Sequence, residues 1–193
     1  MKIAKLLALG AVLLFGSNAA QAVDDNVWTK PSPAEYATWV EGEEYYLYNT
    51  GSGLLFTQGN AWGTQASIGT SGLKVKIESV EGMEGVYHII DYCESKSAWL
   101  WWWFVDDGVS MYVDYNGQAD HLWEITSMGD QVYRLAPSAQ NPTVNNNTLF
   151  VGLNTVENPA NTALSANNEA GSGAFIDWKF LPIASGETYM AQV

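Results

Sequence analysis

Tryptophan is the residue type in this chain best suited to holding a ligand, and it is concentrated in one short run. Nine of the 193 residues are tryptophans, and four of these nine are Trp99, Trp101, Trp102 and Trp103. Two carboxylates, Asp106 and Asp107, follow soon after. Indole rings stack on the apolar face of a sugar ring, while neighbouring polar groups hydrogen-bond its hydroxyls. This run is therefore a candidate ligand-binding surface.

Other roles for the same run remain open. On a strand over 99–105, side chains alternate between two faces, and both faces of this strand are apolar. A barrel strand has only one face inside, so the other must be covered by the chain's own amino-terminal arm, by a sugar or by a partner protein. The sequence Asp106-Asp107-Gly108 is also a good hairpin turn that needs no ligand.

A second candidate surface lies in the glycine-rich segment 59–65. Trp62 is flanked there by Asn60 and Gln65, whose amide groups can donate and accept hydrogen bonds. This composition is typical of a carbohydrate contact. The competing and more ordinary interpretation is a loop tryptophan that folds back over the end of the domain.

The sequence contains no catalytic motif. The two histidines, His88 and His121, lie in strand-like runs and are assigned ordinary structural roles. No serine sits in a strained glycine elbow, and no cysteine–histidine signature is present. Asp106 with Asp114 is a possible carboxylate pair for glycoside cleavage, but 21 acidic residues produce close pairs by chance. With no segment matching a calcium loop or a zinc cluster, we expect no enzyme activity, cofactor or metal.

The middle of the chain shows how these residues are positioned. Segment 86–128 holds four runs typical of β-strands, at 86–90, 99–105, 111–113 and 121–125, separated by turn-forming or charged residues. Segments 45–82 and 132–183 repeat the same order of runs. No stretch between the runs has helical periodicity, so the sequence predicts an all-β domain of three units.

The register of the units supports this repeat. Their opening aromatic residues are Tyr46, Tyr87 and Tyr133, spaced by 41 and 46 residues. Their closing residues are Val75, Trp123 and Trp178, each followed two positions later by Ile77, Ile125 or Phe180. A period of this size indicates one supersecondary unit used three times in a closed architecture.

Three units of four strands resemble a β-trefoil. Within that fold, the segments at 122–125 and 177–180 resemble the closing segment of the ricin-type lectin repeat, whose usual signature is glutamine-x-tryptophan. His121 and Ile176 hold the place of that glutamine here. The resemblance implies a single β-trefoil domain over 45–193, with Trp123 and Trp178 in its core.

A second, looser resemblance concerns the source of the chain. The segments at 45–49 and 60–66 look like a stretch that recurs in exported proteins of the Bacteroides and Prevotella type. This resemblance implies a source and a compartment more than a function.

Residues 1–22 are interpreted as a signal peptide. Lys2 and Lys5 precede an apolar run over 6–15 that is too short to span a bilayer. Ala20-Gln21-Ala22 matches the small-x-small cleavage pattern. We expect cleavage after Ala22 and a secreted or periplasmic protein.

Residues 23–44 are expected to form an arm that packs over the main domain. The arm contains two tryptophans, Trp28 and Trp39, and two prolines. A single helical turn is expected at 34–40, because a serine and a proline supply a start signal there.

The net charge limits the classes of partner that the chain can bind, and the cysteine count limits its disulfides. Without Lys2 and Lys5 the eight basic residues fall to six, against 21 acidic ones, for a net charge of −15. Such a field repels nucleic acid and anionic lipid, so we expect no nucleic-acid partner and no membrane insertion after signal removal. Cys93 is the only cysteine, which excludes an intramolecular disulfide, and it is expected to be buried.

These observations together predict a secreted, non-catalytic binding module. The first hypothesis is that it binds glycan through exposed aromatic residues. The alternative is a protein-binding trefoil, such as an inhibitor or a surface-assembly component, with no sugar specificity. A glycan-cleaving enzyme is the third and least favoured hypothesis.

Overall fold

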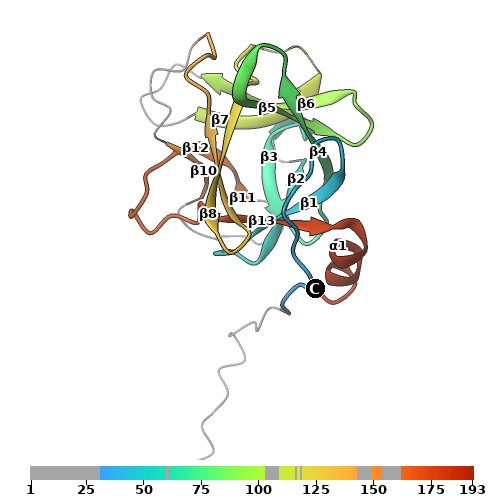
Figure 1. The fold of residues 1–193 in the computed structure, drawn as a ribbon. Helices are drawn as coiled ribbons and strands as arrows, with labels where there is room; N and C mark the ends of the chain where they lie inside the picture. The colour runs from blue at the N-terminus through green and yellow to red at the C-terminus, as the bar shows by residue number, and fades with distance from the viewer. Residues whose placement is uncertain are drawn as a thin grey trace, which may run out of the picture.

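Six antiparallel strands form a closed barrel at the centre of the molecule (Figure 1). The computed structural model describes residues 31–59, 61–102, 109–115, 117, 119–142, 149–153 and 162–193, and it gives the backbone alone for 61, 100–102 and 109. The barrel strands, in order around the ring, are β1 (Glu44–Asn49), β4 (Lys74–Val80), β5 (Met83–Asp91), β8 (Trp123–Gly129), β9 (Val132–Pro137) and β13 (Trp178–Pro182). Each strand pairs with the next, and β13 pairs back with β1. Closure of the ring satisfies the backbone groups that an open edge would expose.

Three strand pairs lie outside the barrel, one in each repeat. They are β2 (Leu54–Gln58) with β3 (Ala66–Gly69), β6 (Lys96–Trp102) with β7 (Val109–Tyr115), and β10 (Phe150–Gly152) with β12 (Ser165–Asn168). These pairs are joined to one another, because β12 pairs with β7 and the short strand β11 (Thr162–Ala163) pairs with β3. A six-stranded barrel with three such pairs is a β-trefoil, so the predicted all-β fold class is confirmed.

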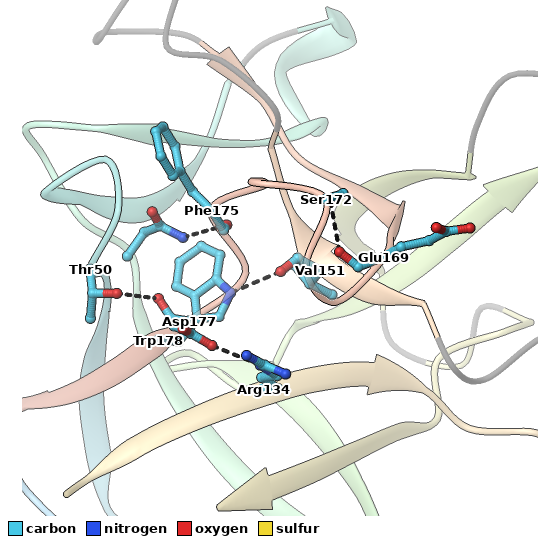
Figure 2. Close-up of polar contacts among 9 residues, drawn as sticks. Thr50, Arg134, Val151, Glu169, Ser172, Phe175, Asp177 and Trp178 are labelled. Carbon is cyan, nitrogen blue, oxygen red and sulfur yellow. Dashed lines mark hydrogen bonds and ion pairs between the residues drawn. The ribbon is translucent and has the colours of Figure 1, made fainter. Parts of the chain in front are cut away.

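The two closing tryptophans lie in the core, as predicted. Trp123 and Trp178 are fully buried. The indole N–H of Trp123 donates to the carbonyl of Ala98 at 2.9 Å, and that of Trp178 donates to the carbonyl of Val151 at 3.0 Å (Figure 2). Each ring therefore ties the last strand of its repeat to the second strand. Both indole N–H groups are used internally, which makes these residues structural.

The opening register predicted from the first repeat is wrong by one residue. Tyr87 pairs with Trp123 and Tyr133 pairs with Trp178, but it is Tyr45 that pairs with Val75. Tyr45 belongs to the barrel core, whereas Tyr46 faces the other side of β1. Side chains alternate along a strand, so a shift of one position moves a residue to the opposite face. Four consecutive hydrophobic residues in β1 conceal which of the two faces is inside.

A carboxy-terminal helix, α1 (Ile183–Met190), was not predicted from the sequence. It follows β13 directly and lies beside β1 and β13 (Figure 1). Its start at Pro182 has no side-chain cap. Its stability comes from packing, since Tyr189 is 1% exposed and donates a hydrogen bond to the carbonyl of Gly53.

The described part of the amino-terminal arm is extended, and the helical turn expected at 34–40 is absent from it. Ala37 forms an isolated β-bridge with Phe180, and its N–H donates to the Phe180 carbonyl at 2.9 Å. The Trp39 ring packs edge-on against the Tyr87 ring, with centroids 5.1 Å apart, and its centroid lies 6.1 Å from that of the Phe180 ring. The arm pairs with β13, which is a tertiary contact. The local start signal for a helix carries no information about such a contact, so the prediction of a helical turn was wrong.

Cys93 is exposed, which contradicts the predicted burial. It lies in the turn between β5 and β6, where the buried Asp91 accepts hydrogen bonds from the backbone N–H groups of Ser95 and Lys96. These hydrogen bonds close the turn that contains the cysteine. Of the apolar residues that suggested burial, Ile89 and Ile90 are in β5, whereas Tyr92 lies beyond the end of that strand and is exposed, as the thiol is.

The signal peptide predicted for residues 1–22 lies outside the described residues. Within the part of the chain that is described, no helix is both long and apolar enough to cross a lipid bilayer.

Candidate functional site

Three aromatic rings from two repeats lie together at the surface, where Trp62 stacks on Tyr112 and Trp99 is tilted by 37° against it. The Trp62 ring lies nearly parallel to the Tyr112 ring, with centroids 6.1 Å apart and 20° between their planes. Tyr112 also contacts Trp99, with centroids 5.5 Å apart. Trp62 is 71% exposed, Trp99 is half-buried and Tyr112 is buried. The stack therefore presents one open indole face that is supported from behind by a fixed phenol.

The loop between β2 and β3 holds Trp62 in an unusual backbone conformation. Trp62 has φ 56° and ψ 15°, which is left-handed and uncommon for a bulky residue. The flanking Gly59 and Gly63 also have positive φ, and the Gly59 N–H donates to the Gln65 carbonyl at 3.3 Å to close the loop. Strain of this kind at an exposed aromatic residue is typical of a functional site.

Strand pairing explains how the two repeats meet. Trp99 in β6 lies directly opposite Tyr112 in β7, so these side chains are cross-strand neighbours. Gln65 forms a β-bridge with Tyr112, and the Val113 N–H donates to the Thr64 carbonyl at 2.8 Å. The first-repeat loop is thus attached to a strand of the second repeat. Burial raises the pKa of the Tyr112 phenol, so this group is neutral at physiological pH.

The structure unites two surfaces that the sequence analysis treated as separate. Trp62 and Gln65 belong to one of them and Trp99 belongs to the other, and all three meet at Tyr112. Tyr112 was not predicted, because nothing in its local sequence distinguishes it from an ordinary strand residue. The Trp62 ring leans on Tyr112, as a loop tryptophan folded back over the end of the domain would, yet it is 71% exposed.

The remaining predicted site residues are only partly described. The backbone of Trp101 and Trp102 belongs to β6 and pairs with Ser110 and Val109. Asn60, Trp103, Asp106 and Asp107 lie outside the described residues. We considered above that the amino-terminal arm covers one face of the strand at 99–105. Trp39 of the arm does not support this, because it packs on Tyr87 and Phe180 instead.

The two histidines lie side by side in the structure, which was not predicted from the sequence. The rings of His88 and His121 are stacked, with centroids 4.6 Å apart and 10° between their planes. The His88 Nδ1 lies 3.3 Å from the His121 carbonyl oxygen. A cavity of about 180 Å³ beside the pair is lined by His88, Ile90, Ser97, Gly117 and His121. The two residues are 33 positions apart, and only the pairing of β5 with β8 brings them close.

The described residues offer no metal centre, because no group of three or more histidine, cysteine, aspartate or glutamate side chains is suitably placed among them. Asp114, the described member of the carboxylate pair considered above, accepts a hydrogen bond from the backbone N–H of Tyr115. We take the aromatic stack and the histidine-lined cavity as candidate sites.

Comparison with solved structures identifies the same fold. No protein-family model and no curated protein sequence matches the chain. A ricin B-like lectin of Macrolepiota procera, solved in complex with lactose, superposes with a TM-score of 0.55 at 9% identity, covering 76% of this chain and 99% of the lectin. A lectin of Polyporus squamosus, bound to a human-type influenza-binding epitope, gives a TM-score of 0.57 at 14% identity and covers 76% of this chain and 51% of the lectin.

Two further solved structures resemble this chain, one a designed symmetric protein and the other an enzyme. A designed 3-fold symmetric protein superposes with a TM-score of 0.52 at 15% identity, covering 72% of this chain and 99% of the design. A β-1,3-galactosidase matches with a TM-score of 0.54 at 16% identity over 82% of this chain but only 34% of the enzyme. The likeness to that enzyme is thus confined to about a third of its length. This chain shares its β-trefoil fold with ricin B-like lectins.

Proposed function

We propose that this protein is a glycan-binding module whose ligand rests on Trp62. The observation that carries the proposal is the stack in which Trp62 is 71% exposed over a buried Tyr112. A flat, rigid, exposed indole matches the apolar face of a sugar ring. The entropic cost of immobilising this ring on binding is small, because Tyr112 and the closed loop already hold it in place.

The surroundings of the stack favour a neutral, hydroxylated ligand. Gln65 lies at the bridge to Tyr112, and an amide group can both donate and accept hydrogen bonds. The formal net charge of the whole chain is −13, so its field opposes anionic ligands. A neutral sugar pays no such electrostatic penalty.

The comparisons support the proposal through the fold alone. Two of the solved structures reported above are lectins, one of them in complex with lactose. The galactosidase matches over a third of its length, which fits a module that accompanies catalysis without performing it. We therefore infer a non-catalytic role that is carried out after export, with the signal peptide cleaved behind Ala22. An origin in the Bacteroides and Prevotella group is part of the same proposal.

A glycan array followed by calorimetric titration of the best ligand tests the proposal. Trp62→Ala should weaken binding about tenfold or more, because the contact of one large side chain is worth at least about 1.5 kcal/mol. Tyr92→Ala is the matched control, since Tyr92 is also an exposed aromatic residue and lies in the turn after β5. Its binding should equal that of the parent protein.

The alternative hypothesis has its own outcome in this experiment. If no glycan binds and a purified extracellular protein does so in a manner that Trp62→Ala abolishes, the surface is a protein interface and the glycan proposal is wrong. Glycan binding that survives Trp62→Ala would likewise contradict the assignment of the ligand to this stack.

A further inference from the structure

We infer that Met190 is a modification site, at which a peroxide converts the thioether to a sulfoxide and thereby releases helix α1 from the barrel. Met190 is the last residue of α1. The inference is independent of the proposed function, because it involves neither Trp62 nor Tyr112. It makes an oxidant the agent that controls how the carboxy-terminal helix is held.

The Met190 side chain makes two kinds of contact at once. Its sulfur accepts a hydrogen bond from the backbone N–H of Gly72, at 3.2 Å, in the segment that follows β3. The side chain also packs against an apolar cluster on β1, β2, β13 and α1. The members of this cluster are Tyr46, Tyr48, Leu55, Leu181 and Tyr189. One thioether thus connects the end of the helix both to a backbone group of the first repeat and to buried side chains of the barrel.

An oxygen atom added to this sulfur is unfavourable on either of its lone pairs. The Gly72 N–H approaches one of them. An N–H···O bond by itself needs about 2.7–3.2 Å between its heavy atoms, so an oxygen on that lone pair would force the sulfur farther from Gly72. An oxygen on the other lone pair would place a polar group against the apolar cluster, where it loses its hydration. Both epimers of the sulfoxide therefore disfavour the docked helix.

The helix is the part that has to move, because Gly72 is fixed by its own packing. A Cβ atom added at Gly72 would lie 2.7 Å from Tyr46 Cδ1 and 3.0 Å from Leu55 Cδ1, so the backbone there fits closely against both side chains. Helix α1 has eight residues and no side-chain cap, so tertiary packing holds it in place. Weakening one docking contact therefore shifts α1 toward an undocked state.

Met190 differs from the other described methionines in being both reachable and engaged in packing. It is half-buried, so a small oxidant can reach its sulfur, whereas Met111 is fully buried in the core. Met128 is 49% exposed near the end of β8, and Met83 lines an open groove in the β4–β5 hairpin. A sulfoxide oxygen at these two hairpin positions can face water, so oxidation there should leave the fold unchanged.

The modification is a two-electron oxygen transfer. The Met190 sulfur attacks the terminal oxygen of a peroxide, and the S–O bond forms while the O–O bond breaks. The sulfur loses two electrons and the peroxide gains them. The other peroxide oxygen takes the proton of the transferred hydroxyl and leaves as water or an alcohol. A methionine sulfoxide reductase restores the thioether, so the modification is reversible.

Release of α1 should also loosen the amino-terminal arm. The Ser185 hydroxyl donates to the Glu35 carbonyl at 2.9 Å and accepts from the Glu35 N–H at 3.1 Å. Ser185 lies in α1 and Glu35 lies in the arm, so these two hydrogen bonds join the two ends of the described chain. We therefore expect oxidation of Met190 to reduce the protection of amides in the arm as well as in the helix.

Hydrogen exchange of the oxidised protein tests the inference. Cys93→Ser is used throughout, because the exposed thiol also reacts with peroxide. After treatment with hydrogen peroxide, peptide mass spectrometry gives the extent of oxidation at each methionine, and amide exchange over 183–192 reports the docking of α1. Oxidation of Met190 should speed this exchange about fivefold to a hundredfold, the rate equivalent of leaving a buried polar group unpaired, and the reductase should reverse it. Complete oxidation of Met190 with unchanged exchange, or a Met190 that resists peroxide while Met128 is oxidised, would overturn the inference.

Two leucine variants provide the matched comparison. Met190→Leu keeps the volume of the side chain but has no sulfur to oxidise, so exchange in α1 should be the same before and after peroxide. Met128→Leu removes a more exposed thioether and should respond to peroxide as the parent protein does. A peroxide response that persists in Met190→Leu, or that is lost in Met128→Leu, would contradict the assignment to Met190.

Discussion

The Tyr46 ring occupies the space that a side chain at Gly186 would need. Gly186 lies in helix α1, and a Cβ atom added there would overlap the edge of the ring. Tyr46 is the residue on the outer face of β1, so this contact is how the helix docks on the barrel. The absence of a side chain at one position thus determines where the carboxy-terminal helix can lie.

Gly186→Ala should destabilise the protein by about 1–3 kcal/mol in urea unfolding, because the added methyl group overpacks a buried contact. Alanine has the higher helix propensity, so propensity alone predicts the opposite sign. Thr188→Ala in the same helix is the control, since Thr188 is exposed and should change stability by about 0.5 kcal/mol or less. A stabilised Gly186→Ala variant would show that α1 does not pack as described.

The left-handed backbone at Trp62 predicts a difference between two truncations. Both Trp62→Ala and Trp62→Gly remove the indole and should lose the same ligand binding. Trp62→Gly should nevertheless be more stable than Trp62→Ala by about 1 kcal/mol, because glycine adopts φ 56° without a steric penalty. Thermal unfolding of the two variants checks this, and equal midpoints would contradict backbone strain at this site.

The pseudo-symmetric tryptophans should respond alike to truncation. Trp123→Phe and Trp178→Phe each lose a buried N–H bond to a carbonyl and leave a small cavity. We expect each to cost about 2–4 kcal/mol in denaturant unfolding. Trp39→Phe is the control, because Trp39 is half-buried and packs on Tyr87 and Phe180 through its ring; its cost should stay below about 1.5 kcal/mol. Unequal costs for the two core residues would argue against equivalent repeats.

Stability should fall in alkaline solution because of Tyr48. Burial is the main cause that raises the pKa of Tyr48 to about 12, from an ordinary value of 10.0. Above pH 10 the unfolded chain loses this proton while the folded chain keeps it, so unfolding becomes more favourable as the pH rises toward 12. The loss from this residue is at most about 3 kcal/mol.

Urea unfolding at a series of pH values measures this dependence. Tyr48→Phe should reduce the alkaline decline, whereas Tyr115→Phe should not, because Tyr115 is 71% exposed. A decline of the same steepness in Tyr48→Phe and in the parent protein would assign the effect to other groups. Tyr189 and Tyr46, whose pKa values burial also raises, are the next candidates in that case.

Much of the architecture was predictable because it depends on local chemistry. The closing residues Val75, Trp123 and Trp178 recur at the ends of the three units, and all three occupy equivalent positions opposite a barrel tyrosine. Apolar runs separated by turn-forming residues indicate strands wherever they occur. That information lies within a few neighbouring residues, so the sequence alone determined the three-unit β-trefoil.

The sites depended on contacts between distant segments, which only the tertiary structure decided. Trp62 and Trp99 become one surface because Tyr112 lies between them, and His88 meets His121 because β5 pairs with β8. Strand pairing brings side chains together across dozens of residues, and no local pattern records which side chains those will be. Helix α1 has the same origin, since packing against the barrel stabilises a segment whose own sequence provides no cap.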